Sequence, residues 1–196
     1  MLKDADIRDS LYKSIESQNS KAVYRIIPEM AICDGLARVD VAVANGKLCG
    51  YEIKSDADSL VRLSSQQMYY DKTFDNISIV VGKKFAPYIQ EEIPSWWGIL
   101  IATQKKNGVV TLKKERAAGH NPNVSAEALL DLLWHDEVKE LLKASGMKGL
   151  SGKNRRILRK LACDCLPFEQ VREFTRETLK NRDEWRPECK LNRPEQ

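Results

Sequence analysis

The hydrophobic residues in the first quarter of the chain follow two different periods. Ile7, Leu11 and Ile15 recur at every fourth position, which predicts an amphipathic helix over residues 4–18. The apolar residues then gather in short runs that are typical of strands. These runs cover residues 23–32, 36–43 and 48–54. The chain therefore changes from a helical to an extended pattern near residue 20.

Two short turn signals separate the three apolar runs. Asp34-Gly35 lies between the first and second runs, and Asn45-Gly46 lies between the second and third. Both pairs favour the tight turns that join antiparallel strands, because their residues adopt positive φ at low cost. The pattern predicts a three-stranded antiparallel meander.

The remaining two thirds of the chain alternate between helical and extended patterns and then become helical. Ser55 and Asp58 have the spacing of an N-terminal cap for a helix that runs to about residue 73. The later segments are predicted as strands at 77–81, 98–103 and 109–113, and as helices at 84–92, 125–144, 151–164 and 168–182. We expect an α/β core in residues 1–120, with a mixed sheet flanked by helices, and a basic helical region in residues 121–196 packed on it.

The register of the first hairpin places two carboxylates side by side. A two-residue turn at Asp34-Gly35 pairs residues whose numbers sum to 69, so Glu29 lies opposite Asp40. Like charges at about 5 Å repel each other unless a cation or a proton lies between them. This pairing therefore indicates a cation site.

The second turn decides whether a third carboxylate joins them. A three-residue loop with Gly46 in the left-handed region pairs residues that sum to 90 and brings Glu52 diagonally next to Asp40. Lys54 shares that face, because side chains alternate along a strand. A two-residue loop would turn Glu52 to the opposite face, so the hypothesis requires the bulged turn.

Together these side chains have the chemistry of a metal-assisted phosphodiester hydrolase. Glu29, Asp40 and Glu52 offer the carboxylate oxygens that Mg²⁺ or Mn²⁺ prefers. A bound metal lowers the pKa of water and neutralises phosphate charge, and Lys54 would orient the water or stabilise developing charge. Taken alone, Glu52-Ile-Lys54 also fits an exposed polar alternation with a weak ion pair. That simpler interpretation does not explain why all three acids share a face.

The acidic and basic residues also match a known sequence pattern. Segments RVD at residues 38–40 and GYEIKS at residues 50–55 resemble the PD-(D/E)xK nuclease superfamily, with Asp40 and Glu52-x-Lys54 as its signature and Val39 in place of the proline. The run from Gly50 to Gln67, with the WWG segment at 96–98, is similar to a poorly characterised bacterial and phage family of that superfamily. The resemblance covers about residues 25–103.

The resemblance implies a restriction-endonuclease-like sheet, a Mg²⁺ or Mn²⁺ site and DNA as the usual substrate. The QQMYY segment at residues 66–70 looks like the Q-x-x-x-Y element of the RecB and phage-exonuclease branch. Arg62, Gln66 and Tyr70 recur every fourth residue, so they predict one polar stripe that contacts nucleic acid beside the site. The superfamily also includes members that bind or regulate without cleaving, which leaves a non-enzymatic function open.

The charge distribution points to a second nucleic-acid surface near the C-terminus. Residues 1–138 hold 17 Lys and Arg against 19 Asp and Glu, whereas residues 139–196 hold 15 against 9. The helix predicted at 151–164 carries Arg155, Arg156 and Arg159, with Ile157 and Leu158 expected to pack inward. Such a surface binds phosphates with little sequence preference. A protein-binding role for the same helices is the alternative.

Two functions follow from the sequence. The first is a Mg²⁺- or Mn²⁺-dependent DNA nuclease, and the alternative is a catalytically silent nuclease-fold protein that binds DNA or a protein in phage or host-defence biology. No N-terminal apolar segment and no long apolar stretch occurs, which predicts a cytoplasmic protein without membrane association. The odd number and irregular spacing of the five cysteines argue against a zinc site.

Overall fold

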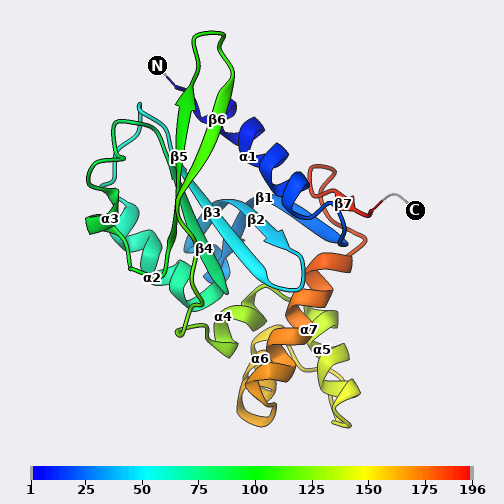
Figure 1. Ribbon diagram of the computed structural model, residues 1–196. Helices are drawn as coiled ribbons and strands as arrows, with labels where there is room; N and C mark the ends of the chain where they lie inside the picture. Colours follow the sequence, from blue (N-terminus) through cyan, green and yellow to red (C-terminus); the bar gives the residue numbers. More distant parts are fainter. Residues whose placement is uncertain (1, 195–196) are drawn as a thin grey trace.

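A computed structural model describes residues 2–194 and shows a seven-stranded mixed sheet with helices on both faces (Figure 1). Its strand order is β6-β5-β4-β3-β2-β1-β7, in which β3, β4 and β5 are parallel and the other neighbours are antiparallel. The first half of the chain forms α1 (Asp4–Gln18), β1 (Tyr24–Ile32), η1 (Cys33–Gly35), β2 (Ala37–Ala44), β3 (Leu48–Lys54), α2 (Leu63–Thr73), β4 (Asn76–Val81) and α3 (Ile89–Glu92). The second half forms β5 (Gly98–Gln104), β6 (Val110–Arg116), α4 (Ala126–Asp131), α5 (His135–Ala144), α6 (Arg155–Cys165), α7 (Phe168–Asn181) and β7 (Leu191–Asn192). The expected α/β class, the antiparallel meander and the C-terminal helices are confirmed.

Two hydrophobic cores lie on opposite faces of the sheet. Strand β2 shows the division most simply, because Val41 and Val43 face one core whereas Ala42 and Ala44 face the other. Helix α1 buries its predicted stripe on the first face, against strands from β1 to β6. Helix α2 and the C-terminal helices cover the second face. The connections through α2 and α3 are the crossovers that parallel strands require.

Helix α2 begins later than its sequence pattern predicts. Ser55 and Asp58 do contact each other, with the Ser55 hydroxyl donating to Asp58 Oδ2 at 2.6 Å, but this contact closes a turn. The helix starts at Leu63, which is buried in the larger core. Residues 55–62 therefore form a loop beside the C-terminal end of β3, where the prediction placed a helical turn.

Several other boundaries also differ from the predictions. The segment predicted as one helix over 125–144 breaks at 132–134, where Leu132 and Leu133 are both buried and Trp134 caps the next helix. The cap of α6 is Asn154, whose side chain accepts from the amide of Ile157, so this helix begins at Arg155 and not at residue 151. Only residues 89–92 of the segment 84–92 are helical. Strand β7 has too few residues to leave a periodic signal and was not predicted.

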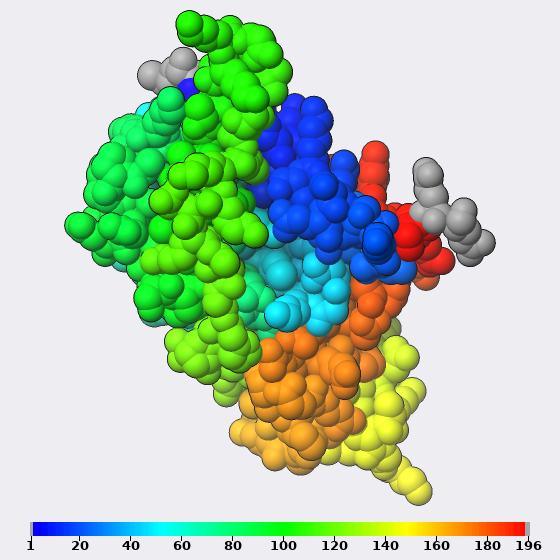
Figure 2. All heavy atoms as spheres, in the orientation of Figure 1, coloured from blue at the N-terminus to red at the C-terminus, as the bar shows by residue number. Residues whose placement is uncertain are grey.

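The C-terminal region is tied to the sheet by packing, by pairing and by a buried ion pair. The larger core runs without a break from the sheet into α4, α5, α6 and α7, and β7 adds a short strand beside β1. Asp75, just before β4, bonds to Arg172 and Arg176 of α7. In Figure 2 the helices, coloured yellow to orange, form a lobe below the sheet. Within residues 2–194, no helix has the length and hydropathy needed to cross a membrane.

Candidate functional site

The first hairpin has the predicted register, but it is distorted at the predicted carboxylate pair. Asp34 and Gly35 both have positive φ, as the tight turn requires. The ladder pairs Met30 with Val39, whose numbers sum to 69, and it skips Glu29 and Asp40. Glu29 has a φ of 50°, which is uncommon for a residue with a side chain. The strand pair is therefore interrupted where the acids lie.

The second turn keeps the acids on one side of the sheet, although its register differs from the prediction. Ala44 pairs with Leu48, so paired residues sum to 92 and not to 90. Both residues are fully buried, which holds them in the ladder and moves the loop one residue along the chain. Gly46 has a φ of 97°, as the bulged turn requires. In this register Glu52 falls opposite Asp40, and because the shift is even it stays on the predicted face.

Asp40 replaces a backbone group at the end of the β2–β3 ladder. The last ladder pair on this side is Val41 with Tyr51. Beyond it, Asp40 Oδ2 accepts a hydrogen bond from the amide of Ile53 at 2.7 Å. This bond fixes the carboxylate beside β3, where the two strands separate. The separation exposes the end of the sheet next to Glu52.

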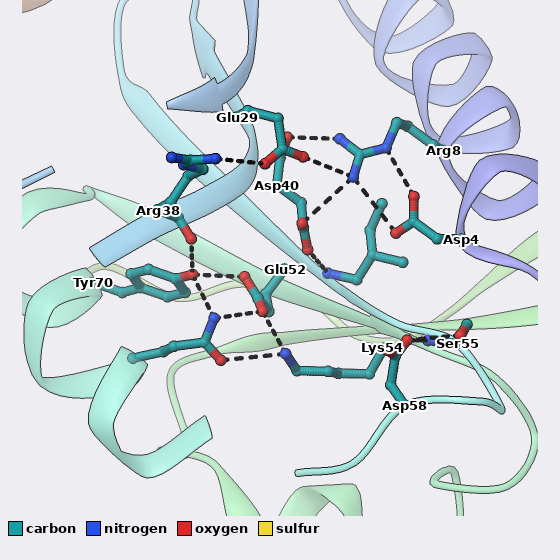
Figure 3. Close-up of polar contacts among 12 residues, drawn as sticks. Asp4, Arg8, Glu29, Arg38, Asp40, Glu52, Lys54, Ser55, Asp58 and Tyr70 are labelled. Atoms are coloured by element: carbon teal, nitrogen blue, oxygen red, sulfur yellow. Dashed lines mark hydrogen bonds and ion pairs between the residues drawn. The ribbon is translucent and has the colours of Figure 1, made fainter. Parts of the chain in front are cut away.

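Glu52 is held by three side chains from β3 and α2 (Figure 3). Its Oε1 accepts from Lys54 Nζ at 2.6 Å and from Gln66 Nε2 at 2.8 Å, and its Oε2 accepts from the Tyr70 hydroxyl at 2.6 Å. Glu52 and Lys54 are both buried. The buried acid is thus paired with a cation and fully hydrogen-bonded, which buried charges require.

Arg8 of α1 binds the other acids, and sequence reasoning missed it. Its Nη2 lies 3.0 Å from Glu29 Oε1 and 3.4 Å from Asp40 Oδ1, its Nη1 donates to the Asp40 carbonyl at 2.9 Å, and its Nε bonds to Asp4 (Figure 3). One signal was present, because Asp4 and Arg8 have the i, i+4 spacing of a helical ion pair. Nothing in the local sequence showed that this pair meets β1 and β2.

A pocket of about 660 Å³ opens over these residues. Its charged lining residues are Asp4, Glu29, Asp40, Glu52, Asp58, Arg38, Lys54 and Arg62. The pocket lies at the C-terminal end of β3, where parallel strands commonly place ligand sites. Five carboxylates against three cations give it a negative character that suits a cation.

The donor set fits a divalent metal held by two carboxylates and not by three. Among residues 2–194, no group of three or more acidic, histidine or cysteine side chains is close enough to hold a metal ion. Glu29, the expected third metal ligand, is held by Arg8 because the distortion of β1 turns it toward α1. Asp40 and Glu52 remain. Mg²⁺ commonly uses one or two protein carboxylates and fills its other positions with water and phosphate oxygens.

Burial, together with the nearby charge of Glu52, makes Asp40 a weaker acid. Burial raises the pKa of Asp40 to about 7, and the charge of Glu52 adds to this shift; the Ile53 amide and Arg8 oppose it. A raised pKa means that the ionised pair is unfavourable without a further cation. A metal ion would supply that cation.

The raised pKa of Asp40 leads to a prediction about the free energy of unfolding in the absence of metal. Because folded Asp40 holds its proton more tightly than the unfolded chain does, its favourable contribution is complete below about pH 4 and is lost as pH rises through about 7. Asp40→Asn should therefore be more stable than the wild type at about pH 8, by about 1–3 kcal/mol, with the difference shrinking toward pH 4. Thermal unfolding in chelator across this pH range measures the effect. A constant difference at every pH would contradict it.

Only part of the polar stripe predicted on α2, Arg62, Gln66 and Tyr70, is accessible to a nucleic acid. Tyr70 is fully buried, stacks on Trp97 at a centroid distance of 6.0 Å and bonds to Glu52, so its expected contact with nucleic acid is wrong. Its ring instead packs in the larger core, against Phe74 and Trp97. Gln66 lines the pocket but is engaged with Glu52 and Lys54. Arg62 is exposed at the pocket edge, as expected.

Some of the basic residues of α6 contact other parts of the protein, and one is exposed to solvent. Arg155 donates to the carbonyls of Asp131 and Leu133, and Arg159 pairs with Asp34 and Asp131, so both connect α6 to neighbouring segments. Both side chains therefore already have partners in the protein, and their predicted contact with nucleic acid stays a prediction. Arg156 is exposed, as predicted. Ile157, expected to pack inward, is 45% exposed.

Fold and site together define an α/β protein with an acidic, lysine-containing pocket at the end of a parallel strand. The chain belongs to the bacteriophage P4 protein cII family, because the model of that family matches residues 3–194. Protein cII of Enterobacteria phage P4 is 29% identical over 182 residues, which cover 93% of this chain and 68% of the relative. No solved structure matches. The family agrees with the expected phage or bacterial context.

Proposed function

We propose that the protein is a Mg²⁺- or Mn²⁺-dependent DNA nuclease. The observation that supports it most is the convergence of Asp40 and Glu52, from adjacent strands, on one pocket beside Lys54. This set of groups is the one that the PD-(D/E)xK resemblance implies. Asp40 and Glu52 would hold the metal. When bound, the metal would supply a more acidic water and neutralise phosphate charge.

Lys54 has the position of a group that handles water and developing charge. Its Nζ lies 2.6 Å from Glu52 and 3.2 Å from Gln66 Oε1, and these two contacts fix the end of a flexible side chain. A fixed ammonium group at the pocket wall can orient an attacking water and stabilise negative charge on a phosphodiester. Most of that benefit depends on the group being held in place before the substrate binds.

Tyr70 and Gln66 are positioning residues in this proposal. The Tyr70 hydroxyl bonds to Glu52 and also lies 2.8 Å from the carbonyl of Arg38. Gln66 donates to Glu52 and accepts from Lys54. The Q-x-x-x-Y element therefore sets the orientation of the acid and the lysine from α2. The DNA contact that the sequence predicts for α2 would then fall to the exposed Arg62.

The proposal is tested by a cleavage assay on linear duplex, nicked and single-stranded DNA with Mg²⁺ or Mn²⁺. We expect phosphodiester cleavage of at least one of these substrates, and its loss when chelator is added. Absence of cleavage on every substrate with both metals would reject the nuclease and favour the second function. The proposed substrate is intracellular DNA, so a cytoplasmic location is part of the proposal.

Arg8 favours the second function, a catalytically silent module that binds DNA or a protein. Its guanidinium is shared by Glu29 and Asp40, and Lys54 pairs with Glu52, so each acid has a cationic partner without a metal, although Arg8 offsets the raised pKa of Asp40 only in part. In this case Lys54→Ala would leave function in cells unchanged, whereas charge reversal at the exposed Arg156 would destroy it. Loss of function in Lys54→Ala, with function retained after charge reversal at Arg156, would support the nuclease.

A further inference from the structure

A second pocket of about 520 Å³ adjoins the acidic one. Glu29, Gly35 and Arg38 line both pockets, so the two are continuous along the β1–β2 turn. The far wall of the second pocket comes from the C-terminal segment, where Trp134 and Trp185 lie. No part of the mechanism proposed above uses this second pocket.

The second pocket has a different charge character from the first. Four arginines line it, against the carboxylates of Glu29, Asp34 and Asp131. Asp34 and Asp131 are both paired with Arg159, which lies outside this pocket, and Glu29 is paired with Arg8. Arg182 is in turn paired with Glu137, so four arginines against three carboxylates leave only a small positive excess, and the exposed Arg38 is well placed to meet an anionic ligand.

Arg38 is the most accessible of these cations. Its side chain is 67% exposed, and its one ion pair among the described residues is a 4.0 Å contact with Glu29. It stands where the two pockets meet. A guanidinium in this place can bind a phosphate that lies between them.

The two tryptophans share one guanidinium, which lies against both rings. The Arg182 guanidinium lies 4.3 Å from the ring centre of Trp134 and 4.4 Å from that of Trp185. Glu137 fixes this guanidinium with two bonds of 2.7 Å. Trp134 nevertheless remains 40% exposed. An aromatic ring held in place, yet open to solvent, binds a planar partner at low entropic cost.

We infer that the second pocket binds a single strand of DNA, with a base stacked on Trp134 and a backbone phosphate on Arg38. The inference rests on the proposed function and names the strand that enters the acidic pocket. Bases inside a duplex are already stacked and paired. The Trp134 ring, which lies in the wall of the pocket, can therefore stack only on an unpaired base. The ligand is therefore single-stranded.

Binding of labelled oligodeoxynucleotides in chelator, measured by fluorescence anisotropy, tests this inference without any cleavage. Trp134→Ala should weaken binding of a single strand of about ten nucleotides by about tenfold or more, because stacking on an aromatic side chain contributes about 1–3 kcal/mol per base. Arg38→Ala should weaken it too and reduce the slope of log K against log salt by about 0.7. Binding of a blunt duplex should change little in either variant.

Two control variants match these changes. Trp96→Ala removes a partly buried tryptophan that precedes β5 and does not line the second pocket, and Lys106→Ala removes an exposed cation from the β5–β6 loop. Neither should alter single-strand affinity. Unchanged affinity in both Trp134→Ala and Arg38→Ala, or equal losses for single strand and duplex, would overturn the inference.

The two proposals fail in different ways. A chain that binds a single strand through Trp134 but cleaves nothing with either metal would reject the nuclease and leave this binding site in place. A chain that cleaves DNA while Trp134→Ala binds normally would reject the binding site alone.

Discussion

Asp40→Asn is expected to lower metal-dependent cleavage by about a thousandfold or more. Replacing a residue that only hydrogen-bonds to a metal ligand already lowers metal affinity or activity by about 10–100-fold, and losing a ligand itself should have a larger effect. Asn keeps the oxygen that accepts from the amide of Ile53, so the local ladder should remain intact. The charge that would bind the metal is lost. Initial rates of DNA cleavage, with circular dichroism to check the fold, measure this effect.

Glu29→Gln separates a site of two carboxylates from one of three. Glu29 is 42% exposed and paired with Arg8, so we expect its replacement to reduce cleavage by about tenfold or less. Equal losses in Glu29→Gln and Asp40→Asn would show that Glu29 belongs to the metal site. A small effect in both variants would contradict the proposed role of Asp40.

Asp75→Ala should destabilise the fold by about 3–5 kcal/mol, the cost of leaving buried charges without a partner. Asp75 is 2% exposed, and its carboxylate accepts from Arg172, from Arg176 and from the amide of Leu48 at 2.7 Å. Its removal would leave two arginines and one backbone amide without their acceptor between β3 and α7. Chemical denaturation measures the change. Glu140→Ala, which removes an exposed acid, should change stability by about 0.5 kcal/mol or less.

The same cluster predicts a sensitivity to acid. Burial alone would raise the pKa of Asp75, but the bonds from Arg176 and Leu48 and the charges of both arginines outweigh it and hold the pKa below its usual value. The contribution of Asp75 is therefore present above about pH 4 and lost as pH falls through the lower, folded pKa. Asp75→Ala should lack this part of the acid dependence. An unchanged acid dependence, with a loss under 1 kcal/mol in neutral buffer, would contradict the role of Asp75.

Local patterns predicted most of the elements because those elements bury a periodic face. Helix α1 and the meander follow directly from apolar spacing and from two glycine-containing turns. The errors arose where tertiary packing decides. Leu132 and Leu133 break the segment between α4 and α5 because both must reach the core. Strand β7 depends on pairing with distant β1.

The site shows the same division between local and distant causes. Asp40 and Glu52 share a face in both the predicted and the observed register, because a shift of two residues keeps the alternation of a strand. Glu29 does not follow the alternation, because its positive φ distorts the strand. Nothing in the sequence signals this distortion, since the residue at this position is not a glycine. Arg8 reaches the site only through the packing of α1 across the meander. Its role had no local signal beyond the pair with Asp4.

The most direct test of the metal site is Mn²⁺ binding, measured by the loss of the free-ion electron paramagnetic resonance signal. At about pH 8 the wild type should bind Mn²⁺ and Asp40→Asn should not, and binding by the wild type should weaken toward pH 5, where Asp40 keeps its proton. Equal binding by the wild type and Asp40→Asn at about pH 8 would contradict a site built on Asp40 and Glu52.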